Sequence, residues 1–182
     1  WSFNPGKAAF GSRLTEAEWA KLKGGKYEPM QPASKTEPVE RFRPAPAELA
    51  DAKSDQEMID RIKQALGGKA YVLETPGGAV VIDAEFLGRH LQRDGRERFL
   101  SFLEPLLEDP DEVFLCPYKN AATGKVVMRR IYLGGFEAEK KRRLLAVAQF
   151  QRGCWVGWTV FPVTQKTYHE KQRVGIRLWP WK

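Results

Sequence analysis

Histidine and hydroxyl side chains set among arginine and lysine are the residues of this 182-residue chain best suited to chemistry. One group surrounds a histidine on a predicted helix, two more fall on predicted strands, and the last lies in the segment TYHEKQRVGIRL, residues 167–178. The candidate side chains are Arg89, His90, Arg96, Arg129, Arg130, Thr159, Tyr168, His169, Lys171 and Arg173. These residue types suit acid–base chemistry and the stabilisation of negative charge.

Cleavage of RNA without a metal is one reaction that needs this set of side chains. The 2′-hydroxyl of RNA is an internal nucleophile, so the protein supplies only a base for its proton and an acid for the leaving 5′ oxygen. Histidine suits both roles because its ordinary pKa of ~6.5 lies near working pH. Arginine, lysine, threonine and tyrosine can hold the phosphate while negative charge builds up on it.

Each of these residues also has a structural explanation. Taken alone, His90 is better explained as a helix residue bonded to a backbone carbonyl, and Thr159 is a good strand former that needs no function. Tyr168 fits a position where the ring packs in the core and the hydroxyl reaches water. Lys171 and Arg173 fit the protection of an edge strand. The combination, rather than any single residue, favours a functional site.

Several familiar chemical motifs are absent from the sequence. It has no P-loop, GxGxxG, HExxH or GxSxG pattern. Cys116 and Cys154 form neither a disulfide framework nor a metal motif, and two histidines without clustered cysteines argue against a zinc site. We therefore expect no metal and no cofactor.

Positive charge is concentrated in the last third of the chain, whose net charge overall is +7. Residues 125–182 hold 13 Lys and Arg against 3 Asp and Glu, a net +10, whereas residues 1–68 carry +1 and residues 69–124 carry −4. A basic region attracts polyanions such as RNA through long-range fields and counterion release. The same charge is also consistent with a solubilising or partner-binding surface.

Helical patterns precede the strands that carry most of the candidate residues. A capping box of Ser54 and Glu57 opens the clearest predicted helix, SDQEMIDRIKQALGG. Asp83 can cap a short second helix, AEFLGRHLQ, which carries Arg89 and His90. RERFLSFLEPLLED has an apolar face typical of a third helix, in which Pro105 predicts a kink or an early stop.

Strand patterns dominate the second half of the chain. AYVLETPGGAVVID, residues 70–83, predicts a β-hairpin around Pro-Gly-Gly. Five further β-like runs cover residues 111–118, 125–133, 143–151, 154–162 and 174–179. Short connections between them predict an antiparallel meander. The predicted fold class is therefore α+β, with N-terminal helices packed on a twisted antiparallel sheet of four to five strands.

The chain divides into a Pro-rich N-terminal strap or linker, residues 1–53, and an α+β domain, residues 54–182. Six of the twelve prolines fall in the first 48 residues, which favours an extended connector. We expect a fragment of a longer protein, since it starts at Trp1. No signal-peptide pattern opens it, and its apolar runs are far shorter than the ~20 residues of a membrane span, so we expect no membrane association.

Four stretches, in their order along the chain, resemble a known family: AEFLGRHLQRDGRERFLSFLEPLLEDPDEVF, VMRRIYL, GWTVFPV and TYHEKQRVGIRL. They resemble the C-terminal nuclease-like domain of phage minor head proteins of the Mu F type. That domain is grouped with the barnase, EndoU, colicin E5/D and RelE-like fold. The resemblance covers roughly residues 69–179, and WSFNPGKAA is similar to a stretch just upstream in such head proteins.

The resemblance implies a small metal-independent ribonuclease used as a toxin module, with tRNA as a candidate substrate. It also implies a cognate immunity protein, which we expect to be acidic because it must cover a strongly basic surface. We expect a delivered or secreted effector domain that acts in the cytoplasm of a bacterial cell. The oligomeric state stays open.

By position, the resemblance assigns roles to the candidate residues. The predicted catalytic residues are His90, Arg129, Arg130, Thr159, Tyr168 and Lys171, and the predicted substrate-binding residues are Arg89, Arg96, Arg173 and His169. His90 is expected to be the acid and base, facing the Lys171 and Arg173 region across a cleft. Its floor would hold Thr159 and one of Arg129 and Arg130.

The sequence departs from the family pattern in two places. His169 has no firm counterpart, and the final WPWK replaces an expected strand ending in tyrosine. Two other classes of function stay open. One is a non-catalytic head-assembly or nucleic-acid-binding module, and the other is a transferase that acts on a nucleotide cofactor, for which the sequence has no phosphate-cradling motif.

Overall fold

The computed structural model describes residues 27–67, 70–90, 96–163 and 170–180, without the side chains of residues 65, 66, 89 and 90. Its helices are α2 (Asp55–Leu66), α3 (Ala84–His90), the 3-10 helix η1 (Arg96–Phe102) and α4 (Leu103–Glu108). Its strands are β1 (Tyr27–Pro29), β2 (Phe42–Pro44), β3 (Tyr71–Leu73), β4 (Val80–Ile82), β5 (Glu112–Asn120), β6 (Val126–Glu137), β7 (Lys141–Gln151), β8 (Cys154–Val163) and β9 (Ile176–Trp179). None of the described helices is long and apolar enough to cross a membrane.

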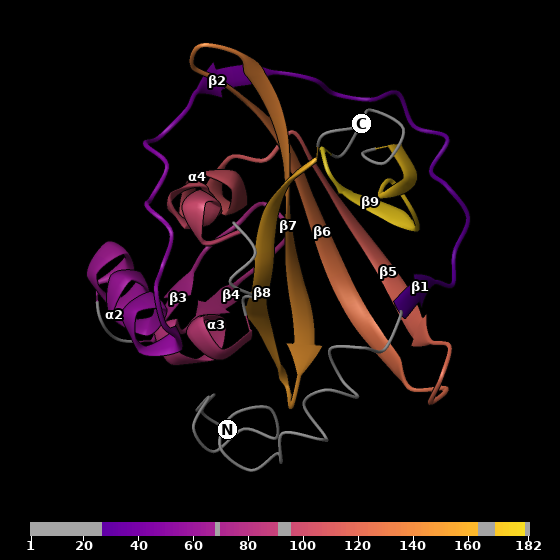
Figure 1. Ribbon diagram of the computed structural model, residues 1–182. Coiled ribbons are helices and arrows are strands. Elements are labelled where there is room, and N and C mark those ends of the chain that lie inside the picture. The colour runs from indigo at the N-terminus through magenta and orange to yellow at the C-terminus, as the bar shows by residue number, and fades with distance from the viewer. Residues whose placement is uncertain (1–26, 68–69, 91–95, 164–169, 181–182) are drawn as a thin grey trace.

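The predicted α+β class is confirmed, and a mostly antiparallel sheet forms its centre (Figure 1). The four long strands β5, β6, β7 and β8 pair in sequence as the predicted antiparallel meander. Their order within the whole sheet is β1-β5-β6-β7-β8-β4-β3, with β9 also paired to β5 and β2 to β6.

The predicted number of four to five strands was too small, because the described part of the chain forms a nine-stranded sheet. Two of the extra strands, β1 and β2, are three-residue pieces, too short to show a period of two in the sequence. The predicted hairpin β3–β4 extends the sheet because β4 pairs with β8 in parallel. The helices precede the meander, but short strands are interleaved with them.

Local side-chain chemistry sets the helix ends. Ser54 caps α2 by accepting a hydrogen bond from the Glu57 backbone N–H at 3.1 Å, and Gly67 ends it at φ +83°. The predicted third helix divides into η1 and α4. Pro105 lies in the first turn of α4, where its missing N–H costs nothing.

Side chains alternate between the two faces of the sheet because successive strand residues point in opposite directions. On one face, here called the helix face, Tyr132, Phe136 and Leu144 pack with buried side chains of α2, η1 and α4. On the other, here called the reverse face, Ile131 and Leu145 belong to a second apolar cluster. Each pair of neighbours on β6 or β7 therefore serves two different environments.

A buried ion pair ties the segment before α2 to the sheet. Arg173 donates to both carboxylate oxygens of Glu112 on β5, from Nε at 2.9 Å and from Nη2 at 2.8 Å. The two side chains are only 8% and 1% exposed. Arg173 also donates to the Thr36 carbonyl at 2.8 Å. In Figure 1 the segment between β1 and α2 runs around the outside of the sheet, and this contact is one of its anchors.

We predict that Arg173→Ala lowers the free energy of unfolding by about 3–5 kcal/mol, because the buried Glu112 carboxylate would keep only the longer contact from Arg177 Nη1, at 3.4 Å. Urea unfolding followed by circular dichroism at pH 7 measures the change. Arg98→Ala is the matched control, since its ion pair with Asp51 joins side chains that are 51% and 54% exposed. The control should cost at most about 1 kcal/mol, and an equal loss in the two variants would contradict the prediction.

Candidate functional site

Arg129 and Thr159 lie on the reverse face of the sheet, on β6 and β8. Arg129 pairs with Gln149 of β7, and the next rung on that face joins Ile131, Val147 and Thr159. The two candidate residues therefore occupy consecutive rungs, two strands apart. Two strand spacings and one rung along the strands put their Cα atoms about 12 Å apart, and the intervening side chains of Ile131 and Val147 are buried.

A β-bulge at Trp158 brings Thr159 to this face. Gly157 pairs with Ala148, but the next residue of β7, Val147, pairs with Thr159 rather than with Trp158. Two residues of β8 thus oppose one residue of β7. Trp158 belongs to the reverse-face cluster, so both bulge residues point that way. With regular alternation, Thr159 would face the helices instead.

The Arg129 guanidinium is held in a fixed position by its neighbours. Its Nε donates to Gln149 Oε1 at 2.9 Å, and its Cζ lies 4.8 Å from the ring centroid of Tyr27 and 5.1 Å from that of Tyr118. Burial lowers the pKa of Arg129, yet arginine stays charged at neutral pH. Nη1 and Nη2 make no hydrogen bond to the described residues, so this ordered cation keeps donors for an anion.

A second cation approaches Thr159 from the start of η1. Arg96 Nη1 lies 3.5 Å from Thr159 Oγ1, and the Arg96 Cζ lies 4.7 Å from the ring centroid of Phe161. Thr159 itself is buried. The hydroxyl thus has Arg96 against it, with Arg129 on the same face two strands and one rung away, and both cations favour a group that gains negative charge.

Helix α3 ends beside the same face and carries the backbone of Arg89 and His90, whose side chains are not described. Its residue Phe86 contacts Trp158 of β8, with 5.0 Å between ring centroids. The close approach of α3 to α2 needs Gly88, because a Cβ there would lie 2.4 Å from Ile59 Cγ1. These contacts fix where α3 stops relative to β8.

Asp83 caps α3 as the sequence predicts. Its Oδ1 accepts hydrogen bonds from the backbone N–H groups of Glu85 at 2.9 Å and Phe86 at 3.2 Å. Burial raises the pKa of the Asp83 carboxyl above its ordinary value, against the lowering effect of these two hydrogen bonds. The carboxyl group that caps α3, the helix that carries His90, is therefore partly removed from water.

Arg130, also predicted as catalytic, lies on the helix face, away from Thr159. Its Nη1 donates to the Ala79 carbonyl at 3.1 Å, and its Cζ lies 4.1 Å from the ring centroid of Trp155. A Cβ on Gly78 would lie 2.9 Å from Arg130 Nη2. These contacts tie the β3–β4 turn to the sheet, so they give Arg130 a structural explanation.

Arg173 was predicted to bind substrate, but its guanidinium is engaged in the buried pair with Glu112. Breaking that pair to bind a phosphate would leave the buried carboxylate with only the 3.4 Å contact from Arg177, which is costly. Lys171 is exposed at the return of the chain toward β9. Tyr168 and His169 lie outside the described residues. The structure thus places Arg96 against Thr159 and Arg129 on the same face two strands away, whereas Arg130 lies on the other face and Arg173 is engaged with Glu112.

Sequence reasoning missed Gln149, Tyr27 and Tyr118, which hold Arg129. The signal for Gln149 was a lone amide among aliphatic residues in LLAVAQF, an unusual choice for a buried strand. Tyr27 gave no signal, because it reaches Arg129 through a three-residue strand on the far edge of β5. Among the described residues, no three His, Cys, Asp or Glu side chains gather as a metal site.

A family model described as phage-Barnase-EndoU-ColicinE5/D-RelE like nuclease2 matches residues 57–180. The matched range contains α2 from its third residue, α3, the meander and β9, and thus every described residue of the site except Tyr27. No curated protein and no solved structure matches the chain.

We predict that Asp83→Ala lowers the free energy of unfolding by about 1 kcal/mol through loss of the α3 cap. Asp83→Asn should cost less, because asparagine keeps the accepting oxygen and carries no charge to desolvate. Thermal or urea unfolding of the three proteins at pH 7 measures both differences.

Wild type and Asp83→Asn together also test whether the pKa of Asp83 is raised in the folded protein. A carboxyl whose pKa is higher in the folded than in the unfolded state takes up a proton on folding, so its contribution is most favourable at low pH and is lost as pH rises through the folded pKa. Wild type should therefore gain stability relative to Asp83→Asn between pH 7 and pH 4. A constant difference across this range would show that the pKa is not raised.

Proposed function

Because the chain belongs to the phage-Barnase-EndoU-ColicinE5/D-RelE like nuclease family, we propose that its reverse sheet face cleaves RNA without a metal ion. The observation that carries the proposal is the shared placement of Arg129 and Thr159 on that face, with Arg96 against the threonine. Two cations and a hydroxyl form a site for a phosphodiester. The helix that ends beside them supplies the histidine that such a reaction needs.

The proposed reaction is attack of the 2′-hydroxyl on the adjacent phosphorus. The 2′-oxygen–phosphorus bond forms, the bond from phosphorus to the 5′ oxygen breaks, and the products are a 2′,3′-cyclic phosphate and a free 5′-hydroxyl. A base removes the 2′ proton and an acid protonates the leaving oxygen. We assign this proton transfer to His90, with Tyr168 and Lys171 as further groups near the phosphate.

The remaining residues would stabilise the charge that builds on the phosphate oxygens. Arg129 is held by Gln149 and two tyrosine rings, so little reorganisation is needed when an anion arrives. Preorganised donors in a partly buried site stabilise developing charge more than donors in water do. DNA would not react, because it lacks the 2′-hydroxyl.

We further propose that the domain serves as a toxin module attached to a larger protein, as the resemblance to Mu F-type minor head proteins suggests. An acidic immunity protein would block it, since residues 125–182 carry a net +10 and carboxylates complement such a surface. Delivery to the cytoplasm of a bacterial cell is part of the same proposal.

Arg129→Ala should lower kcat/KM for a fluorescent RNA oligonucleotide by about 10²–10³-fold in EDTA, the usual effect of losing one charge-stabilising donor. His90→Ala should lower it by about 10²–10⁴-fold. A DNA oligonucleotide of the same sequence should stay intact. Mass spectrometry of the RNA products should find the cyclic phosphate.

Arg61→Ala provides the control, because Arg61 forms a surface pair with Glu57 on α2, outside the site. It should keep wild-type activity. Intact RNA with every protein, together with salt-dependent binding of that RNA, would instead support the alternative of a non-catalytic nucleic-acid-binding or head-assembly module. Equal activity of Arg129→Ala and Arg61→Ala would remove Arg129 from the site.

A further inference from the structure

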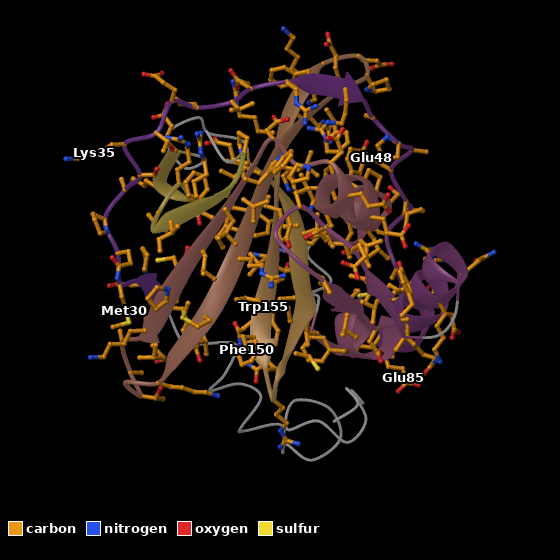
Figure 2. All side chains as sticks on the ribbon, turned by 180° about the vertical axis from the view of Figure 1, so that it is seen from behind. Met30, Lys35, Glu48, Glu85, Phe150 and Trp155 are labelled. Atoms are coloured by element: carbon orange, nitrogen blue, oxygen red, sulfur yellow. The ribbon has the colours of Figure 1, made fainter. Side chains whose placement is uncertain are left out.

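Part of the helix face is not covered by helices, and it is apolar. Phe150 on β7 is 42% exposed and Val126 on β6 is 49% exposed. Figure 2 shows Phe150 and Trp155 on the open part of the sheet, away from α2 and α3. Phe150 pairs with Trp155 in register. We call these two residues the aromatic platform.

The platform presents a ring that a flat ligand can reach. The Phe150 and Trp155 ring centroids lie 5.4 Å apart at an interplanar angle of 60°. Arg130 occupies the space above Trp155, with Cζ 4.1 Å from the ring centroid. Trp155 is thus held between an arginine and a phenylalanine, and Phe150 is the more exposed ring.

Cations lie at the strand ends around the platform. Lys119 is the second-last residue of β5 and Arg152 lies in the β7–β8 turn; both are exposed, and neither forms an ion pair with the described residues. No Asp or Glu occurs between Val113 and Phe136, or from residue 140 to residue 169. Glu28 of β1 pairs in register with Lys119, whereas β7 and β8, which carry the platform, hold no Asp or Glu. An aromatic ring beside an exposed cation on such strands is the pattern of a single-stranded nucleic-acid platform.

The platform adjoins the candidate site through the end of the β7–β8 hairpin. Gln149, which holds Arg129, and Phe150 are neighbours that point to opposite faces. Arg152 follows two residues after Phe150, in the turn just beyond the end of β7. A nucleic-acid backbone can therefore pass around this turn from the reverse face to the platform within a few nucleotides.

We propose that Phe150 stacks an unpaired base of a single-stranded nucleic acid whose backbone crosses the β7–β8 turn toward Arg129. Resting on the proposed function, this inference defines the substrate as single-stranded RNA with an unpaired nucleotide beside the cleaved bond. Bases inside a duplex cannot reach the platform, because their faces are already stacked on one another.

A second copy of this chain is a poorer occupant. It would bring Lys119 and Arg152 against the same residues of its partner, and like charges across an interface oppose association. A single nucleic-acid strand instead brings phosphates to those cations and a base to the exposed ring.

The test uses a single-stranded oligodeoxynucleotide of about 15 thymidines, which 2′-hydroxyl attack cannot cleave. Fluorescence anisotropy with the full chain should show a dissociation constant about tenfold higher for Phe150→Leu than for wild type, because leucine keeps the apolar contact but not the stacking ring. Val72→Ala is the control, since Val72 is 61% exposed on the distant strand β3 and should leave binding unchanged.

A second variant tests the backbone path. Arg152→Asn removes the charge and keeps a residue that tolerates the positive φ of 47° at this position. It should reduce the slope of log affinity against log salt by about 0.7, the value for one phosphate contact on a single strand. Circular dichroism and thermal melting establish that each variant is folded.

The outcomes separate this inference from the proposed function. If wild type cuts no RNA but Phe150→Leu loses oligonucleotide binding, the platform stands and the nuclease proposal falls. If wild type cuts RNA but Phe150→Leu binds the oligonucleotide as well as Val72→Ala does, the platform proposal is wrong and this face serves another partner, such as a protein. Absence of any single-strand binding by wild type also overturns it.

Discussion

The alternation of side chains between the two sheet faces along the central strands determines where the functional residues lie. β6 and β7 are paired on both sides, so each of their side chains must face one side of the sheet or the other. Arg129 and Arg130 are adjacent, yet one faces the candidate site and the other supports the β3–β4 turn. Gln149 and Phe150 divide in the same way. Two distinct surfaces thus share the same strands and are fixed relative to each other by the sheet itself.

The buried Glu112–Arg173 pair adds a second constraint at the outer edge of β5. It joins this strand to the segment that leads into β9 and to Thr36. β1 lies farther along the same edge and places Tyr27 against Arg129. Residues distant in sequence are therefore needed to hold one guanidinium of the site.

The features predicted from the sequence are those that depend on neighbouring residues. The helix caps at Ser54 and Asp83 follow from hydrogen bonds that span two or three residues. The long strands of the meander follow from β-rich runs with short connections. These signals are local, so tertiary packing did not have to be known.

The features that could not be predicted depend on register or on distant partners. Arg129 and Arg130 are identical in type, and only the pairing with Gln149 and Ala148 determines which faces Thr159. Arg173 looked like a surface cation because its partner, Glu112, lies 61 residues earlier. The parallel pairing of β4 with β8 similarly depends on where α3 packs, which no local pattern encodes.

The bulge at Trp158 makes the alternation of side chains along β8 part of the site, because it decides which face of the sheet Thr159 occupies. Every residue of β8 beyond it has exchanged faces relative to a regular strand. Deleting Trp158 would leave Thr159 opposite Val147 on the reverse face, whereas a strand that kept all its residues but lost the bulge would carry the hydroxyl to the helix side. An alignment of related strands must therefore place the extra residue at Trp158, because an alignment that ignores it compares positions that face opposite sides of the sheet.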